Sequence, residues 1–144
     1  MYKRQPKIRY INYFILIHEN KIFIRKRTEK NIWKNLFEPP NFDTDIPLDD
    51  PNLVIEFLKS KDFFKPLKKE IEIKHIYETK HQLTHQTLYA RFWLTDSYNV
   101  KKSYLKNFEE VPINQLYRYP IHRLFDKFLN FHNLQSSITN NNVG

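Results

Sequence analysis

The 144-residue sequence has no cysteine and a single glycine, Gly144. Without cysteine, disulfides, thiolate catalysis, zinc–thiolate sites and iron–sulfur ligation are excluded within this chain. Long apolar runs are missing too, since the longest, YFILI at 13–17, is far too short to cross a bilayer. The N-terminus lacks the apolar core and cleavage site of a signal peptide. These absences predict a cytoplasmic protein with no membrane partner.

Aromatic and basic residues are abundant instead. Aromatic side chains make up 16% of the chain and can supply much of the apolar area of a single-domain core. The formal net charge of +8 favours anionic partners such as nucleic acid, because lysine and arginine near phosphates release condensed counterions. The basic residues are spread along the chain rather than gathered in one tract, so solubility alone is the competing interpretation of this charge.

The first half of the chain predicts a hairpin, a loop and a helix. Residues 8–17 are β-rich and apolar, and residues 22–27 alternate apolar with basic or aromatic side chains, which indicates two strands joined by a turn at 19–21. Residues 28–50 predict a long, proline-punctuated loop of the kind that often carries function, anchored by Trp33, Leu36 and Phe37. Asp50 followed by Pro51 is a typical helix start.

The second half predicts two adjacent strands and a helix. Residues 71–79 and 86–95 alternate, and the second strand places Leu88, Ala90, Phe92 and Leu94 on one side. An apolar stripe with helical spacing predicts an amphipathic helix that begins near Tyr119 and Pro120; its members are Ile121, Leu124, Phe125, Phe128 and Leu129.

The heptapeptide KHQLTHQ connects the two predicted strands and therefore forms a hairpin tip. Lys80, His81, Thr84 and His85 offer hydrogen-bond donors there, and Leu83 is an apolar wedge, so the tip could contact a base and its phosphates. Alternatively, Leu83 tucks back into the core and the segment is an ordinary turn. The two histidines have no nearby carboxylate and no orienting acid, so neither a metal site nor a catalytic residue is assigned.

Three stretches together resemble the C-terminal domain of bacterial adenine DNA glycosylase, the MutY family. They are KIRYINYFILIHENKIFIRKRTEKNIWKNLFEPP from Lys7 to Pro40, the hairpin segment HQLTHQTLYARF, and the closing PIHRLFDKFL. The family motifs appear in family order: a basic pair at Lys26 and Arg27, the "W..L.E.P" segment that starts at Trp33, the hairpin, and a terminal amphipathic helix. The resemblance covers nearly the whole chain, to about Leu129.

The resemblance implies an α+β, Nudix-like fold, with a mixed β-sheet sandwiched between α-helices. It also implies that the domain recognises 8-oxoguanine opposite adenine in double-stranded DNA rather than catalysing hydrolysis. An N-terminal glycosylase domain, which holds the family's iron–sulfur cluster, would be the protein partner and would remove the adenine. This fragment, expected to be monomeric, has no cofactor and cannot excise adenine alone.

The family's "Phe-Ser-His" tip corresponds to Leu83, Thr84 and His85 in this sequence. Thr84 keeps the hydroxyl that can hydrogen-bond the N7–H edge of 8-oxoguanine, whereas unmodified guanine has only an acceptor at N7. Leu83 replaces the aromatic wedge, and the segment EPP replaces the more usual Glu-Phe-Pro. Phosphate contacts are assigned to three further residues, Lys34, Lys80 and His81.

The main alternative is an active Nudix hydrolase that cleaves a nucleoside diphosphate derivative. That chemistry needs a glycine-bearing loop and a helix with clustered glutamates that bind magnesium. The only glycine is at position 144, and the acidic residues that follow Phe42 are scattered, so the sequence disfavours this activity.

A protein-interaction module is the third class, because Tyr89, Arg91 and Trp93 on one strand face could form an interface. The competing expectation is that this face packs under the terminal helix, since a sandwiched sheet needs apolar cover on both sides. We expect one domain at 1–133, with an N-terminal arm or linker at 1–6, and a polar, disordered tail at 134–144.

Overall fold

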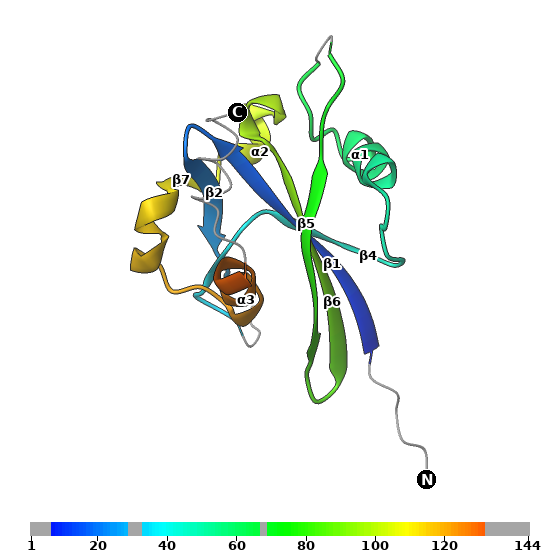
Figure 1. Cartoon of the computed structure of the whole chain (residues 1–144), viewed down its shortest axis with the longest axis vertical. Coiled ribbons are helices and arrows are strands. Elements are labelled where there is room, and N and C mark those ends of the chain that lie inside the picture. Colours follow the sequence, from blue (N-terminus) through cyan, green and yellow to red (C-terminus); the bar gives the residue numbers. More distant parts are fainter. Residues whose placement is uncertain (1–6, 29–32, 67–68, 132–144) are drawn as a thin grey trace.

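The computed structural model describes residues 7–28, 33–66 and 69–131. Among these residues, seven strands form one mixed sheet (Figure 1). They are β1 (Lys7–His18), β2 (Lys21–Lys26), β3 (Phe37–Glu38), β4 (Asn41–Thr44), β5 (Lys74–Gln82), β6 (Gln86–Asp96) and β7 (Glu109–Pro112). The order is β3-β2-β1-β6-β5, with β4 also paired to β1 and β7 to β2. The expected arm at 1–6 and tail at 134–144 lie outside the described residues.

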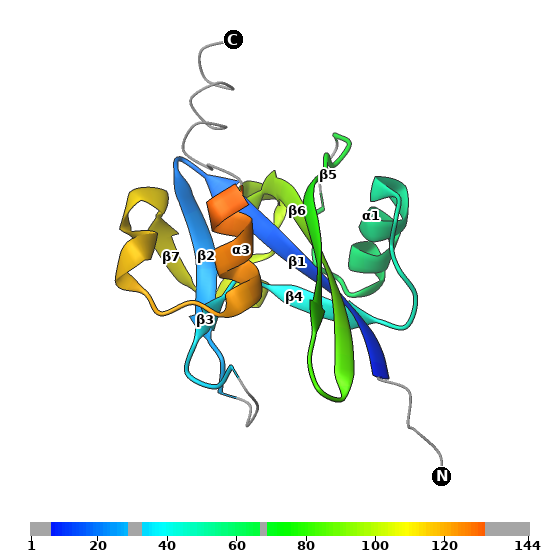
Figure 2. The same ribbon diagram turned by 60° about the horizontal axis from the view of Figure 1, so that its bottom comes forward.

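Helices cover both faces of this sheet (Figure 2). The α-helices are α1 (Pro51–Ser60), α2 (Lys102–Leu105) and α3 (Arg123–Phe131), and two short 3₁₀ helices are η1 (Ser97–Asn99) and η2 (Ile113–Arg118). One core cluster joins the sheet to α3, where Phe92 and Phe128 stack with ring centroids 4.6 Å apart. A second cluster joins the other face to α1 through Val54 and Leu58. The predicted α+β sandwich is therefore confirmed.

The parallel pairing of β1 with β6 forms the centre of the sheet. It runs from Lys7 opposite Gln86 to Ile17 opposite Asp96, while β5 pairs antiparallel with the other edge of β6. The β1–β2 hairpin turns through Glu19 and Asn20, whose φ values of 51° and 63° match the mirror-image turns that follow strand twist without any glycine.

Several sequence expectations need correction. The loop predicted at 28–50 contains β3 and β4, and the strand predicted at 71–79 is instead Lys74–Gln82, with a bulge between His75 and Tyr77. The last helix begins at Arg123 rather than near Tyr119. Strand β7, which pairs with β2, was not predicted.

We expected the terminal helix to cover the face of the sheet that carries Tyr89, Arg91 and Trp93, but it covers the opposite face. Leu88, Ala90 and Phe92 belong to the cluster under α3, whereas Trp93 belongs to the cluster under α1. The two sets lie on different faces because successive side chains of a strand point to opposite sides of the sheet. Tyr89 therefore lies on the α1 face, where it remains 37% exposed.

Candidate nucleic-acid interface

The tip between β5 and β6 is a tight turn fixed to the rest of the sheet. The Leu83 amide donates to the Gln86 carbonyl at 2.7 Å, which closes the turn. The Lys7 amide donates to the His85 carbonyl at 3.0 Å, which ties the turn to the first residue of β1. Two hydrogen bonds from different segments thus hold the backbone of the tip in one place, so its side chains are presented from a defined position.

The three tip residues are not equivalent. Thr84 and His85 are exposed, whereas Leu83 is half-buried and packs against the core cluster under α3. The hydroxyl and the imidazole are therefore available to a ligand, while part of the Leu83 side chain already has apolar neighbours. This arrangement combines the two sequence interpretations, since the turn is anchored by Leu83 and still presents polar groups.

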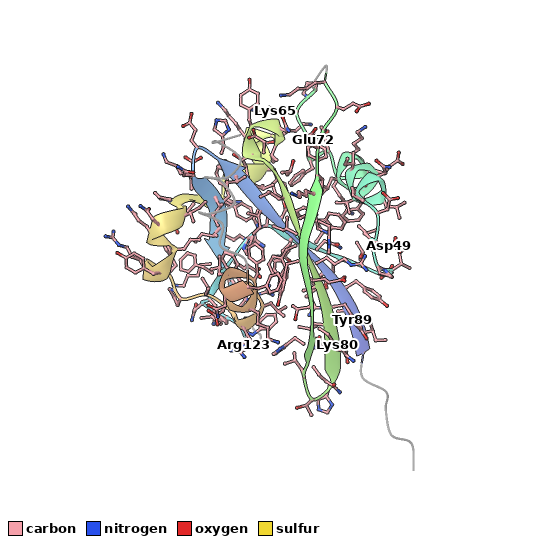
Figure 3. All side chains as sticks on the ribbon, viewed as in Figure 1. Asp49, Lys65, Glu72, Lys80, Tyr89 and Arg123 are labelled. Atoms are coloured by element: carbon pink, nitrogen blue, oxygen red, sulfur yellow. The ribbon has the colours of Figure 1, made fainter. Side chains whose placement is uncertain are left out.

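The remaining predicted contacts fall on two surfaces. Lys80 lies opposite Tyr89, on the α1 face, with Nζ 5.7 Å from the centroid of the Tyr89 ring. His81 lies opposite Leu88, on the α3 face. Figure 3 shows Lys80 and Tyr89 together on the hairpin, and Arg123 at the start of α3. The structure does not bring Lys80 and His81 to one surface, because neighbours along a strand point to opposite faces.

His81 sits in a basic and aromatic environment between β5 and α3. Its Nδ1 is 3.5 Å from Lys127 Nζ, and its ring centroid is 6.1 Å from that of Trp33. Burial lowers the pKa of His81, and the positive charges of Lys127 and Arg123 lower it further. An ammonium only donates, so the contact favours the neutral tautomer with its proton on Nε2, where it can donate to a phosphate oxygen.

The basic residues of α3 lie on the same side of the hairpin as His81, and Trp33, the residue before Lys34, lies beside the His81 ring. Lys34 is exposed and directly follows the buried Trp33. Arg123 and Lys127 were not singled out from the sequence, although their i, i+4 spacing places them on one helix face, next to the apolar stripe. They supply positive charge beside the neutral His81 imidazole, and phosphate contacts require such charge and hydrogen-bond donors.

A buried polar cluster lies behind this surface. Glu38 accepts hydrogen bonds from Arg27 Nη1 at 2.7 and 2.9 Å, and its Oε2 is 3.1 Å from His122 Nε2. The Trp33 ring stacks on His122 with a centroid distance of 4.7 Å. In the sequence these residues belong to separate motifs. The structure brings the basic pair, the "W..L.E.P" segment and the start of the terminal helix to one point.

The ionisation of Glu38 follows from these contacts. Burial by itself raises the pKa of this carboxyl, but the hydrogen bonds from His122 and Arg27 and the guanidinium charge outweigh it, so the net pKa is lowered. Glu38 is 1% exposed, so its charge is satisfied entirely by protein groups. The cluster therefore joins β2, β3 and the start of α3 into one unit that supports Trp33 and His81.

Helix α1 carries one acidic residue, the exposed Glu56. Within residues 7–28, 33–66 and 69–131, no three His, Asp or Glu side chains lie close enough to hold a metal ion. No helix in these ranges is long and apolar enough to cross a membrane.

Comparisons with known proteins agree with this architecture. The adenine DNA glycosylase of Buchnera aphidicola subsp. Schizaphis graminum is 39% identical over 99 residues, which is 68% of this chain and 24% of the relative. The chain thus spans about a quarter of the length of that relative. The solution structure of the E. coli ORF135 protein aligns over 81% of both chains with a TM-score of 0.53 at 10% identity, which shows a shared fold. Residues 12–131, from the middle of β1 to the end of α3, match the NUDIX domain family, so the chain belongs to that family.

Proposed function

We propose that this Nudix domain is the lesion-reading part of an adenine DNA glycosylase, and that it recognises 8-oxoguanine opposite adenine through Leu83, Thr84 and His85. The similarity to the Buchnera glycosylase supports a role in DNA repair. The observation that carries the finer proposal is the hairpin tip. It is braced by two backbone hydrogen bonds, yet leaves Thr84 and His85 exposed.

The chemistry of the tip suits the difference between the two bases. 8-Oxoguanine carries a proton on N7, where guanine has only a lone pair, so a hydrogen-bond acceptor placed at that edge distinguishes them. The Thr84 hydroxyl oxygen can accept that proton. With guanine the same hydroxyl can rotate and donate to N7, so discrimination requires that its proton be engaged by another acceptor in the complex.

Basic residues on the two sides of the hairpin supply affinity. Lys80 on the α1 face, and Lys34, His81, Arg123 and Lys127 on the α3 side, can follow a phosphate backbone past the tip. Phosphate contacts position a protein on the duplex and base contacts specify the sequence. We therefore assign affinity to these five residues and discrimination to Thr84.

Adenine removal belongs to the remainder of the proposed enzyme. This chain has no cysteine, so an iron–sulfur cluster would be held by the N-terminal glycosylase domain. The domain described here would place that catalytic part over the adenine by holding the opposite base.

A comparative titration tests the proposal. The chain alone, and the chain joined to the catalytic domain of an adenine DNA glycosylase, are titrated at one salt concentration with duplexes that carry 8-oxoguanine:adenine or guanine:adenine. We expect weak binding by the chain alone and a clear lesion preference for the joined protein that exceeds the preference of the catalytic domain by itself. Equal preference with and without this chain would overturn the proposal.

A further inference from the structure

The side-chain amide of Gln86, the first residue of β6, is held in one orientation. Arg9 Nη1, on the neighbouring strand β1, donates to Gln86 Oε1 at 3.3 Å. A guanidinium carries hydrogen-bond donors only, so the amide atom that faces it must be the oxygen, and the Nε2 amino group lies on the other side. Within the described part of the chain, Gln86 Nε2 makes no hydrogen bond of its own. The hairpin therefore presents an amide donor whose role is fixed by its neighbour.

Asp43 keeps the arginine in place. Arg9 Nε donates to Asp43 Oδ2 at 2.8 Å, and Arg9 Nη2 donates to the same oxygen. Asp43 belongs to β4, which pairs with the edge of β1 that does not pair with β6. A rotated Gln86 amide would turn its own N–H groups toward a guanidinium that cannot accept them, so this arrangement opposes rotation.

Gln86 lies directly beside the exposed residues of the hairpin tip. The Leu83 amide donates to the Gln86 carbonyl, so these two residues face each other across the turn. Gln86 and Leu88 are two positions apart on β6, so the Gln86 side chain lies on the α3 face, where Leu83 also packs. Gln86 is half-buried, which leaves part of its side chain open to a ligand. Figure 1 shows the start of β1 and the hairpin tip at the same end of the molecule.

8-Oxoguanine differs from guanine at two neighbouring positions of the base. Its N7 carries a proton, and its C8 carries a carbonyl oxygen where guanine has a C–H group. An acceptor and a donor held side by side therefore match both changes. The Thr84 hydroxyl can exchange its accepting role for a donating one by rotation, whereas Arg9 opposes the corresponding exchange in Gln86. A fixed donor is thus the complement that a rotating hydroxyl needs.

We propose that Gln86 is a second specificity-determining residue, whose Nε2 donates to the C8 oxygen of 8-oxoguanine, and that Arg9 is the positioning residue for its amide. This role rests on the proposed function, in which Thr84 reads the N7 edge of the same base. Guanine offers no acceptor at C8, so there the Gln86 donor gains no hydrogen bond from the base. A phosphate oxygen would accept equally well in either duplex, so dependence on the lesion distinguishes a base contact from a backbone contact.

A third duplex separates the two edges of the base. The joined protein is titrated with duplexes that carry 8-oxoguanine, 8-thioguanine or guanine opposite adenine. 8-Thioguanine keeps the N7 proton but has sulfur, a weaker acceptor, in place of the C8 oxygen. Gln86→Met removes the donor with little change in side-chain length. It should lower the preference for 8-oxoguanine over guanine by about threefold to tenfold, the scale of one neutral hydrogen bond, and should shrink the difference between 8-oxoguanine and 8-thioguanine.

Matched variants separate this role from a structural one. Gln82→Met is the control, because Gln82 is an exposed glutamine of the same hairpin that pairs with Thr87 and lies on the opposite face of the sheet. It should leave the preference unchanged. Arg9→Met frees the Gln86 amide to rotate and should lower the preference, whereas Arg9→Lys keeps a cationic donor and should restore part of it. Free energies of unfolding, measured for every variant, identify any change that comes from loss of folded protein.

Two results would overturn the inference. One is an unchanged preference in Gln86→Met, and the other is equal weakening of binding to all three duplexes, which identifies a phosphate contact. In either case a loss of preference in Thr84→Ala leaves the proposed function standing. If the natural chain in the joined protein adds no preference for either modified base over guanine, the proposed function and the role of Gln86 fail together.

Discussion

His122 Nε2 lies 3.1 Å from Glu38 Oε2 in the interior of the protein, although the two residues are 84 positions apart in the sequence. Arg27, the residue that follows β2, also pairs with Glu38, with Nη1 at 2.7 Å from Glu38 Oε1. The stacked ring of Trp33 covers His122, and the Trp33 ring in turn lies beside His81. The candidate interface on the α3 side therefore rests on a buried charged cluster as well as on the apolar core cluster under α3.

Replacing the central carboxylate should destabilise the domain. Glu38→Gln removes the buried carboxylate that pairs with Arg27, and removal of one partner of a buried ion pair costs about 3–5 kcal/mol. The measurement is the free energy of unfolding in urea. Asp62→Asn is the control, because Asp62 pairs with Lys101 on the surface with 84% of its side chain exposed. We expect a change of about 1 kcal/mol or less for that variant. Equal losses in both variants would contradict the role of the cluster.

The same carboxyl predicts how stability changes in acid. The folded-state pKa of Glu38 is lowered, so its contribution is fully present above the ordinary glutamate pKa and is lost as the pH falls through the lowered folded-state pKa. Unfolding free energies measured from pH 7 downward should fall more steeply for the natural chain than for Glu38→Gln in that acidic window. Parallel curves would show that Glu38 ionisation contributes nothing.

We expect the His81 imidazole to take up a proton when the protein binds DNA. Burial, Lys127 and Arg123 lower the pKa of the free His81 imidazole, and a nearby phosphate would raise it by stabilising the charged form. Affinity should therefore increase as the pH falls below the His81 pKa of the complex, by up to about tenfold per unit of pKa difference. His81→Gln should flatten this dependence. A pH profile that is unchanged in His81→Gln would remove the imidazole from the interface.

The basic residues of α3 should contribute to affinity without contributing to discrimination. Arg123→Gln and Lys127→Gln should each weaken binding to lesion and normal duplexes alike, and each should lower the slope of log affinity against log salt by about 0.9 if the residue neutralises one phosphate. Lys102→Gln provides the comparison, since Lys102 is exposed on α2, at the end of the molecule away from the hairpin tip (Figure 1). A lesion-specific loss in either α3 variant would contradict this division of roles.

Leu83 should act mainly through packing. Its half-buried side chain contacts the core cluster under α3, so Leu83→Ala should cost about 1 kcal/mol of stability, less than a fully buried leucine. Leu83→Phe restores the aromatic residue that the MutY resemblance implies and should tighten binding to both duplexes by better stacking. Chemical denaturation and duplex titration measure the two effects. Weaker binding in Leu83→Phe would argue against any contact between this position and the bases.

Strand periodicity predicted the centre of the fold from sequence. The alternation in β6 placed Leu88 and Phe92 together, and the hairpin tip was located because two alternating segments flank a polar turn. The same rule implies that Lys80 and His81 point to opposite faces. The prediction of both residues as phosphate contacts on one surface did not take into account that side chains alternate between the two faces of a strand.

The buried cluster could not be predicted, because it depends on long-range pairing. Glu38 reaches His122 because Phe37 forms a bridge with Ile121, a contact between segments far apart in the sequence. Strand β7 was missed for a related reason. Its four residues include two glutamates, and its place in the sheet comes from pairing with β2 rather than from an apolar pattern of its own.

The most direct test of the central claim is the preference of the joined protein for 8-oxoguanine:adenine over guanine:adenine duplexes. The preference is measured for the natural chain and for Thr84→Ala and Thr84→Ser. Ser103→Ala is the control, because Ser103 is an exposed hydroxyl residue on α2. The account predicts that Thr84→Ala loses about 1–3 kcal/mol of preference, the usual scale for a base contact, while Thr84→Ser and Ser103→Ala retain it. An unchanged preference in Thr84→Ala would contradict the account and return the tip to being an ordinary turn.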